Sequence, residues 1–193
     1  MFIDVGSARL FFDVVGESLD AETSNMAQRP TLILLHGGPG YDHSTLRPYF
    51  DRYSNTHQLI YLDHRGCGRS TGEKETWHLD QWADDIAIFC STLSISSPVV
   101  FGQSFGGMVA MHYAARHPKG ISKLILSSTA AQFRLDETVK MMHKLGGPEL
   151  QMLHMSSFPI RPKLPMTLMV RSACRCTATL MCLRRAALSV TVL

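Results

Sequence analysis

The chain has 193 residues, 45% of them hydrophobic and 18% charged, which suits one soluble globular domain with room for the beginning of an insertion. Its net charge of +3 comes largely from the C-terminal region, so it implies no nucleic acid partner. The N-terminus lacks the basic and apolar regions of a signal peptide, and the apolar runs near the C-terminus are too short to cross a membrane. Five cysteines, an odd number without framework spacing, favour a reducing compartment, and we expect a cytoplasmic protein.

The hydrophobic pattern predicts an α/β fold in which a mostly parallel sheet carries helices on both faces. The predicted strands lie near residues 2–5, 9–15, 31–35, 58–62, 98–102 and 123–127, and the predicted helices near 44–53, 79–93, 105–117 and 133–145. The first two strands should form a hairpin around Gly6 and Ser7, and the later ones should pair in parallel through right-handed crossovers. Residues 16–30, with Gly, Ser, Asn and Pro, are expected to form a mobile loop.

A glycine-rich segment directly follows the aliphatic strand at 31–35. It consists of His36, Gly37, Gly38, Pro39 and Gly40. Its position fits the loop that supplies one backbone N–H to an oxyanion hole. Such glycines also occur in ordinary turns and in phosphate-binding loops, but the chain has no G-x-x-x-x-G-K-[ST] and no G-x-G-x-x-G after its first strand.

A second loop, Asp63 to Ser70, follows the strand at 58–62. Asp63 and Arg65 are expected to fix a turn, in which Gly66 and Gly68 adopt backbone angles that other residues avoid. We assign this loop no direct chemistry.

A third segment has the G-x-S-x-G spacing of a nucleophile elbow, a sharp turn between a strand and a helix that exposes a serine. Ser104 is its candidate nucleophile, and the strained turn requires small residues on both sides, here Gly102 and Gly106. Gly107 should allow the following helix to pack closely on its strand. The amide of Phe105 should be the second oxyanion donor, because it follows the nucleophile directly.

These three segments, in this order, resemble the proline iminopeptidase branch of the α/β-hydrolase superfamily, over roughly residues 1–150. The resemblance implies a serine hydrolase that removes an N-terminal residue, often proline, from small peptides or aminoacyl amides without a metal or other cofactor. It also implies that Ser104 is the nucleophile and that Gly38 and Phe105 supply the oxyanion amides. Related members act as esterases, so an ester substrate stays open as an alternative, and the oligomeric state is not predicted.

A serine nucleophile needs a histidine base and an orienting carboxylate, which in this fold follow it in the order acid, then histidine. The downstream acids are Asp136, Glu137 and Glu149, and the downstream histidines are His112, His117, His143 and His154. His112 and His117 are expected on the helix that starts at the elbow. An amphipathic segment is expected to carry the next candidates on a solvated face: Asp136, Glu137, His143 and Glu149. Glu149 and His154 have the permitted order but no core strands before them. We therefore expect the triad acid and base to be missing, and a non-catalytic fragment is the alternative function.

The composition changes after Glu149, beyond which the chain has six basic residues and no acidic one. We predict an N-terminal part of the hydrolase core at 1–131, the start of a helical lid at 132–155, and an aberrant or disordered tail at 156–193, although a genuine short C-terminal region is an alternative. Cys174, Cys176 and Cys182 have no fourth ligand nearby, so no metal site is expected. Without the last core strands, residues 124–126 should lie on an uncovered sheet edge.

Overall fold

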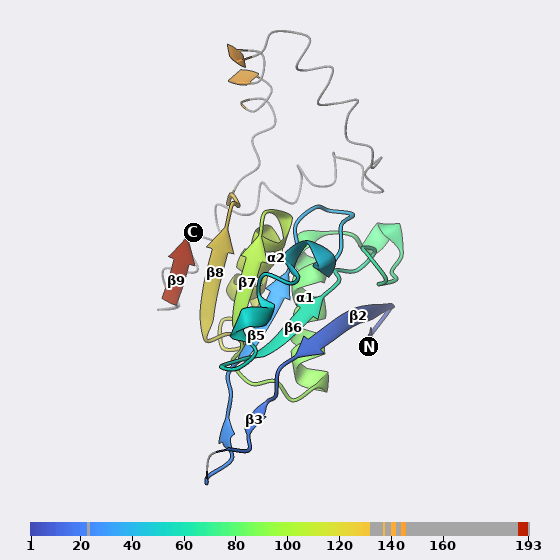
Figure 1. Cartoon of the computed structure of the whole chain (residues 1–193). Helices are drawn as coiled ribbons and strands as arrows, with labels where there is room; N and C mark the ends of the chain where they lie inside the picture. The colour runs from blue at the N-terminus through green and yellow to red at the C-terminus, as the bar shows by residue number, and fades with distance from the viewer. Residues whose placement is uncertain (23, 132–136, 138–139, 142–143, 146–188, 193) are drawn as a thin grey trace.

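The fold is built on a central sheet of seven strands (Figure 1). The structure is a computed structural model that describes residues 1–22, 24–131, 137, 140–141, 144–145 and 189–192. In spatial order the strands are β1 (Phe2–Val5), β2 (Ala8–Val15), β6 (Gln58–Leu62), β5 (Thr31–Leu35), β7 (Val99–Gln103), β8 (Lys123–Ser127) and β9 (Ser189–Val192). Six of them match the strands that the apolar runs predict, within about one residue at each end.

The pairing of the strands confirms the predicted topology. β1 and β2 form an antiparallel hairpin in which Val5 pairs with Ala8, and Gly6 turns the chain at a φ of 65°. β2 also runs antiparallel to β6, whereas β6, β5, β7 and β8 run parallel to one another. The carboxyl ends of these four parallel strands therefore lie at one edge of the sheet, where a binding crevice is expected in an open α/β fold.

Alternate residues of each central strand face two separate hydrophobic clusters. One face packs on the helices α1 (Leu79–Thr92) and α2 (Phe105–Arg116), and Ile33, Ile60 and Val100 belong to that cluster. The other face packs on the 3₁₀ helix η1 (His43–Leu46) through Leu34, Tyr61 and Leu46. Figure 1 shows α1 and α2 side by side behind the sheet, with η1 in front. Among the described residues, no helix has the length and apolarity to cross a membrane.

Two local predictions are wrong. Residues 44–53 do not form one helix but two short 3₁₀ helices, η1 and η2 (Asp51–Tyr53), because Pro48 follows Arg47 and that residue takes an extended conformation at a φ of −96° and a ψ of 147°. Residues 16–30 are not simply a loop, since β3 (Leu19–Asp20) and β4 (Ala27–Gln28) pair as a two-stranded antiparallel arm. A third 3₁₀ helix, η3 (Lys74–Thr76), precedes α1.

The edge of β8 is covered, contrary to expectation. β9 runs parallel to β8, with Lys123 paired to Ser189 and Leu126 to Val192, so backbone groups at 123–126 have a partner strand. The sequence indicated no core strand here, because residues 189–192 lack the longer aliphatic run of the other parallel strands. Most of the predicted lid and tail, including Cys174, Cys176 and Cys182, lies outside the described residues.

Candidate active site

Ser104 lies in the sharp turn between β7 and α2, as the elbow pattern predicts. Ser104 is exposed to solvent. Its backbone has a φ of 51° and a ψ of −116°, a conformation that residues with a side chain rarely adopt. The Ser104 amide donates to the carbonyl of Ser127 at 2.9 Å, which ties the turn to the end of β8. The strand, turn and helix therefore present a serine hydroxyl at the carboxyl edge of the sheet.

The glycines of the elbow are required by close backbone contacts. A Cβ atom on Gly102 would lie 2.5 Å from the carbonyl oxygen of Gly106 and 2.6 Å from the Cα of Gly107. A Cβ on Gly106 would collide with the carbonyl oxygens of Leu35 and His36. The close packing of α2 on its strand thus depends on glycine at positions 102 and 106, whereas a Cβ on Gly107 would meet the side chain of Thr129, which follows β8.

The HGGPG loop, residues 36–40, lies beside the elbow. A Cβ atom on Gly37 would be 3.4 Å from the Cβ of Ser104. Gly38 and Gly40 have φ values of 120° and 94°, which favour glycine strongly. Pro39 joins them within the same turn. The amide of Phe105 is at the first position of α2, where helix geometry leaves N–H groups without an intrahelical acceptor. The HGGPG loop and the elbow, from which the two oxyanion amides are predicted to come, are therefore neighbours in space.

The loop from Asp63 to Ser70 supports the HGGPG loop rather than contributing a reactive group. Asp63 is fully buried and accepts hydrogen bonds from the amides of His43 and Arg69, at 2.9 and 3.0 Å. Its Oδ2 and the side chain of Asp42 occupy the space that a Cβ on Gly68 would need. The Sγ of Cys67 accepts from the amide of Gly40 at 3.4 Å, so the two loops are joined directly.

Arg65 fixes the other side of this loop. Its guanidinium forms a buried, bidentate ion pair with Asp85 of α1, at 2.6 and 2.8 Å, and Nη1 also donates to Ser7. Gly66 has a φ of 72°, and a Cβ there would collide with the ring of Trp77. The predicted structural role of Asp63 and Arg65 agrees with these contacts.

Three histidines near the two loops form ring hydrogen bonds or ion pairs with other groups of these loops or of β2. His36 accepts the His64 amide at Nε2, at 3.2 Å, so its Nδ1 carries the proton and donates to the carbonyl of Gly37 at 2.7 Å. His64 Nε2 donates to the carbonyl of His36 at 3.2 Å. Burial lowers the pKa of His36, and it lowers the pKa of His64 well below its usual range, so both rings are neutral. His43 lies between Asp63 and Asp13.

The histidines of α2 also face away from the elbow. His112 is buried, with its Nδ1 3.1 Å from Asp80, and His117 caps the C-terminus of α2 with its Nε2 2.8 Å from Asp84. Both contacts are with α1. Of the other candidates for the triad, Glu137 is helical and exposed, whereas Asp136, His143, Glu149 and His154 lie outside the described residues.

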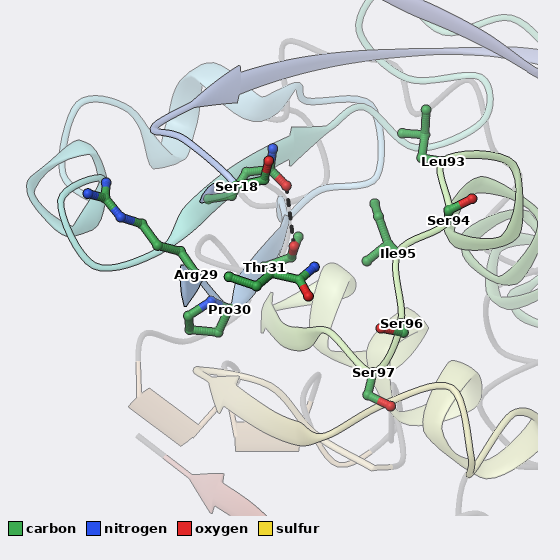
Figure 2. Close-up of a pocket in the computed structure, with 11 residues that line it drawn as sticks. Ser18, Arg29, Pro30, Thr31, Leu93, Ser94, Ile95, Ser96 and Ser97 are labelled. Atoms are coloured by element: carbon green, nitrogen blue, oxygen red, sulfur yellow. Dashed lines mark hydrogen bonds between the residues drawn. The ribbon is translucent and has the colours of Figure 1, made fainter. Parts of the chain in front are cut away.

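A cavity of about 400 Å³ lies at the other end of the sheet (Figure 2). It is bordered by Thr31 at the start of β5, Gln58 at the start of β6, and the loop Leu93–Ser97 that precedes β7. Figure 2 shows the side chains of this loop opposite Ser18 and Thr31. Because Ser104 follows the carboxyl end of β7, this cavity at the amino ends is separate from the elbow.

Comparison with known proteins decides the family. The alpha/beta hydrolase fold family matches residues 30–153, which include both glycine loops and the elbow. The chain belongs to the alpha/beta hydrolase fold family. It is 33% identical over 132 residues to a proline iminopeptidase of Clostridioides difficile, an alignment that covers 67% of this chain and 43% of the relative. A proline iminopeptidase of Lactiplantibacillus plantarum is 31% identical over 129 residues, covering 65% of this chain and 42% of the relative.

The structural comparison agrees on the fold. The crystal structure of a proline iminopeptidase from Mycobacterium smegmatis has a TM-score of 0.65 at 24% identity, covering 92% of this chain and 58% of that protein. The resemblance to the proline iminopeptidase branch that the three segments predict is confirmed. The chain spans less than half the length of the curated relatives it matches.

The sequence missed two residues of this site, His43 and Thr129. Thr129 donates from its hydroxyl to the carbonyl of Ser104 at 2.6 Å. Each follows the carboxyl end of a parallel strand, and these ends meet at one edge of the sheet. Because of this topology, the polar residues that follow β5 and β8 could have been predicted from the sequence as members of the site.

Proposed function

We propose that the chain carries the nucleophile and the oxyanion amides of a serine hydrolase of the proline iminopeptidase type. It would release an N-terminal residue, often proline, from small peptides or aminoacyl amides in the cytoplasm. The observation that supports this most is the exposed Ser104 at a φ of 51°, with Gly37 of the HGGPG loop next to its Cβ.

In the proposed reaction, Ser104 Oγ attacks the carbonyl carbon of the substrate. The amides of Gly38 and Phe105 stabilise the negative oxygen of the tetrahedral intermediate, each by roughly 2.7–4 kcal/mol. The C–N bond then breaks, and the amine leaves with the proton that the serine gave up. Water hydrolyses the resulting ester and restores the hydroxyl. None of these steps requires a metal or another cofactor.

We assign none of His36, His43 and His64 as the base that takes the serine proton, because each makes a ring contact with another group described above. This favours a second candidate function, a non-catalytic chain that keeps the elbow as a scaffold. A chain without the base and acid would still retain roughly 10³–10⁴-fold catalysis over water from the oxyanion hole and binding.

Labelling with a fluorophosphonate probe separates the two functions. The hydrolase predicts labelling of the folded chain that is lost in Ser104→Ala and kept in Ser94→Ala, which changes another exposed serine with positive φ. An absence of labelling would leave the scaffold function. If labelling occurs, turnover of a proline anilide against a simple aryl ester distinguishes the aminopeptidase from an esterase.

A further inference from the structure

The strained backbone of Ser104 is held by three hydrogen bonds, of which one comes from a side chain. The Ser104 amide donates to the Ser127 carbonyl at 2.9 Å, and the Ser104 carbonyl accepts from the Gly107 amide at 3.0 Å. The third bond runs from Thr129 Oγ1 to the same Ser104 carbonyl at 2.6 Å and is the shortest of the three. A sparsely populated conformation persists only where its surroundings over-determine it.

Thr129 reaches the elbow because of the turn after β8. Ser128 has a φ of 47°, and on its two sides the Ser127 carbonyl and the Thr129 hydroxyl both bond to Ser104. Gly107 leaves the space for this side chain: a Cβ there would lie 2.6 Å from the Cβ, Cγ2 and Oγ1 of Thr129. The end of β8 and the residues that follow it therefore contact both the nucleophile and the first turn of α2.

We propose that Thr129 is a positioning residue for the Ser104 nucleophile, which its hydroxyl holds in the exposed conformation through the Ser104 carbonyl. The expected effect of Thr129 on the reactivity of Ser104 rests on the proposed function, whereas its expected effect on the backbone conformation of Ser104 does not. Thr129 touches no reacting atom; it acts through the peptide group that follows the nucleophile. Loss of the hydroxyl should loosen the elbow without unfolding the sheet, because Thr129 is only half-buried.

The test compares Thr129→Val, which keeps the branched shape and removes the hydroxyl, with Thr129→Ser, which keeps the hydroxyl. Thr92→Val is the matched control, since Thr92 Oγ1 also donates to a backbone carbonyl, that of Ile88 on α1, away from the elbow. Two quantities are measured on the full chain: the rate of fluorophosphonate labelling, and hydrogen exchange of the Ser104 and Gly107 amides by NMR.

We expect Thr129→Val to label at least tenfold more slowly and to exchange both amides at least tenfold faster. Thr129→Ser and Thr92→Val should stay within about twofold of the parent chain. Unchanged exchange in Thr129→Val, or no rescue in Thr129→Ser, overturns the proposal. If the parent chain does not label at all, the hydrolase function fails and exchange alone decides the role of Thr129. Should Thr129→Val not fold, Thr129→Ala removes the same hydroxyl and takes its place in the comparison.

Discussion

His43 donates two hydrogen bonds to one carboxylate oxygen of Asp63, from its backbone amide at 2.9 Å and from its ring Nδ1 at 2.7 Å. His43 follows the HGGPG loop, and Asp63 follows β6, so this contact ties the end of the loop to the sheet. Asp63 is fully buried, and its second oxygen accepts from the Arg69 amide. The carboxylate is therefore an acceptor for three donors of two loops.

The first prediction is that Asp63→Asn destabilises the fold by about 2–3 kcal/mol, because the amide group of asparagine turns a donor toward buried donors and leaves one unsatisfied. The measurement is the free energy of unfolding in urea. Asp4→Asn is the control, because Asp4 is exposed and its ion pair with Arg9 is long, at 4.0 Å. This variant should change stability by less than about 1 kcal/mol. Equal effects at the two positions would contradict the role assigned to Asp63.

The second prediction concerns the ion pair of Arg65 and Asp85. Both side chains are buried, so Asp85→Asn leaves a guanidinium without its counter-charge and should cost about 3–5 kcal/mol. The adjacent Asp84 offers a control on the same helix. Its partners Arg116 and His117 are both partly exposed to solvent, so Asp84→Asn should cost less than about 1 kcal/mol. A urea titration of both variants tests the contrast, and a cost at Asp85 no larger than that at Asp84 would be inconsistent with it.

Much of this fold could be predicted because its central strands are short aliphatic runs, such as 31–35 and 58–62, that are buried on both faces. The elbow and the HGGPG loop could be predicted because each needs glycines at fixed spacing. The contacts of His43 and Thr129 could not, since each depends on a partner brought near by the sheet rather than by the local sequence. The prediction of a helix at 44–53 is wrong for a different reason. The spacing of Leu46 and Phe50 indicates a buried face, but a segment with two short 3₁₀ helices on either side of Pro48 buries the same two residues.

The third prediction is a loss of stability in mild acid. Burial lowers the pKa values of His36 and His64 in the folded chain, whereas the unfolded chain binds protons at both near pH 6.5. The unfolded state therefore holds more protons below that pH, and stability falls as the pH drops from 7.5 to 5.5, by up to about 1.4 kcal/mol per pH unit for each histidine.

Urea titrations at pH 7.5, 6.5 and 5.5 measure this slope. His64→Gln, which can still donate to the carbonyl of His36, should make it shallower. In NMR spectra, the ring resonances of both histidines should not titrate near pH 6.5 while the chain is folded. A slope that is the same in His64→Gln as in the parent would show that His64 does not cause it.

The fourth prediction tests the strain at Ser104 without any reference to catalysis. Relief of a positive φ gains about 1–3 kcal/mol, while glycine costs about 0.5–1 kcal/mol relative to alanine in conformational entropy. Ser104→Gly should therefore be more stable than Ser104→Ala by about 1 kcal/mol. The order should reverse at Ser91, an exposed helical residue of α1, where alanine is favoured over glycine by about 1 kcal/mol. Urea midpoints of the four variants decide the matter. If alanine were the more stable at both positions, the turn at Ser104 would carry no strain, and the argument that its backbone is held to expose a hydroxyl would fail.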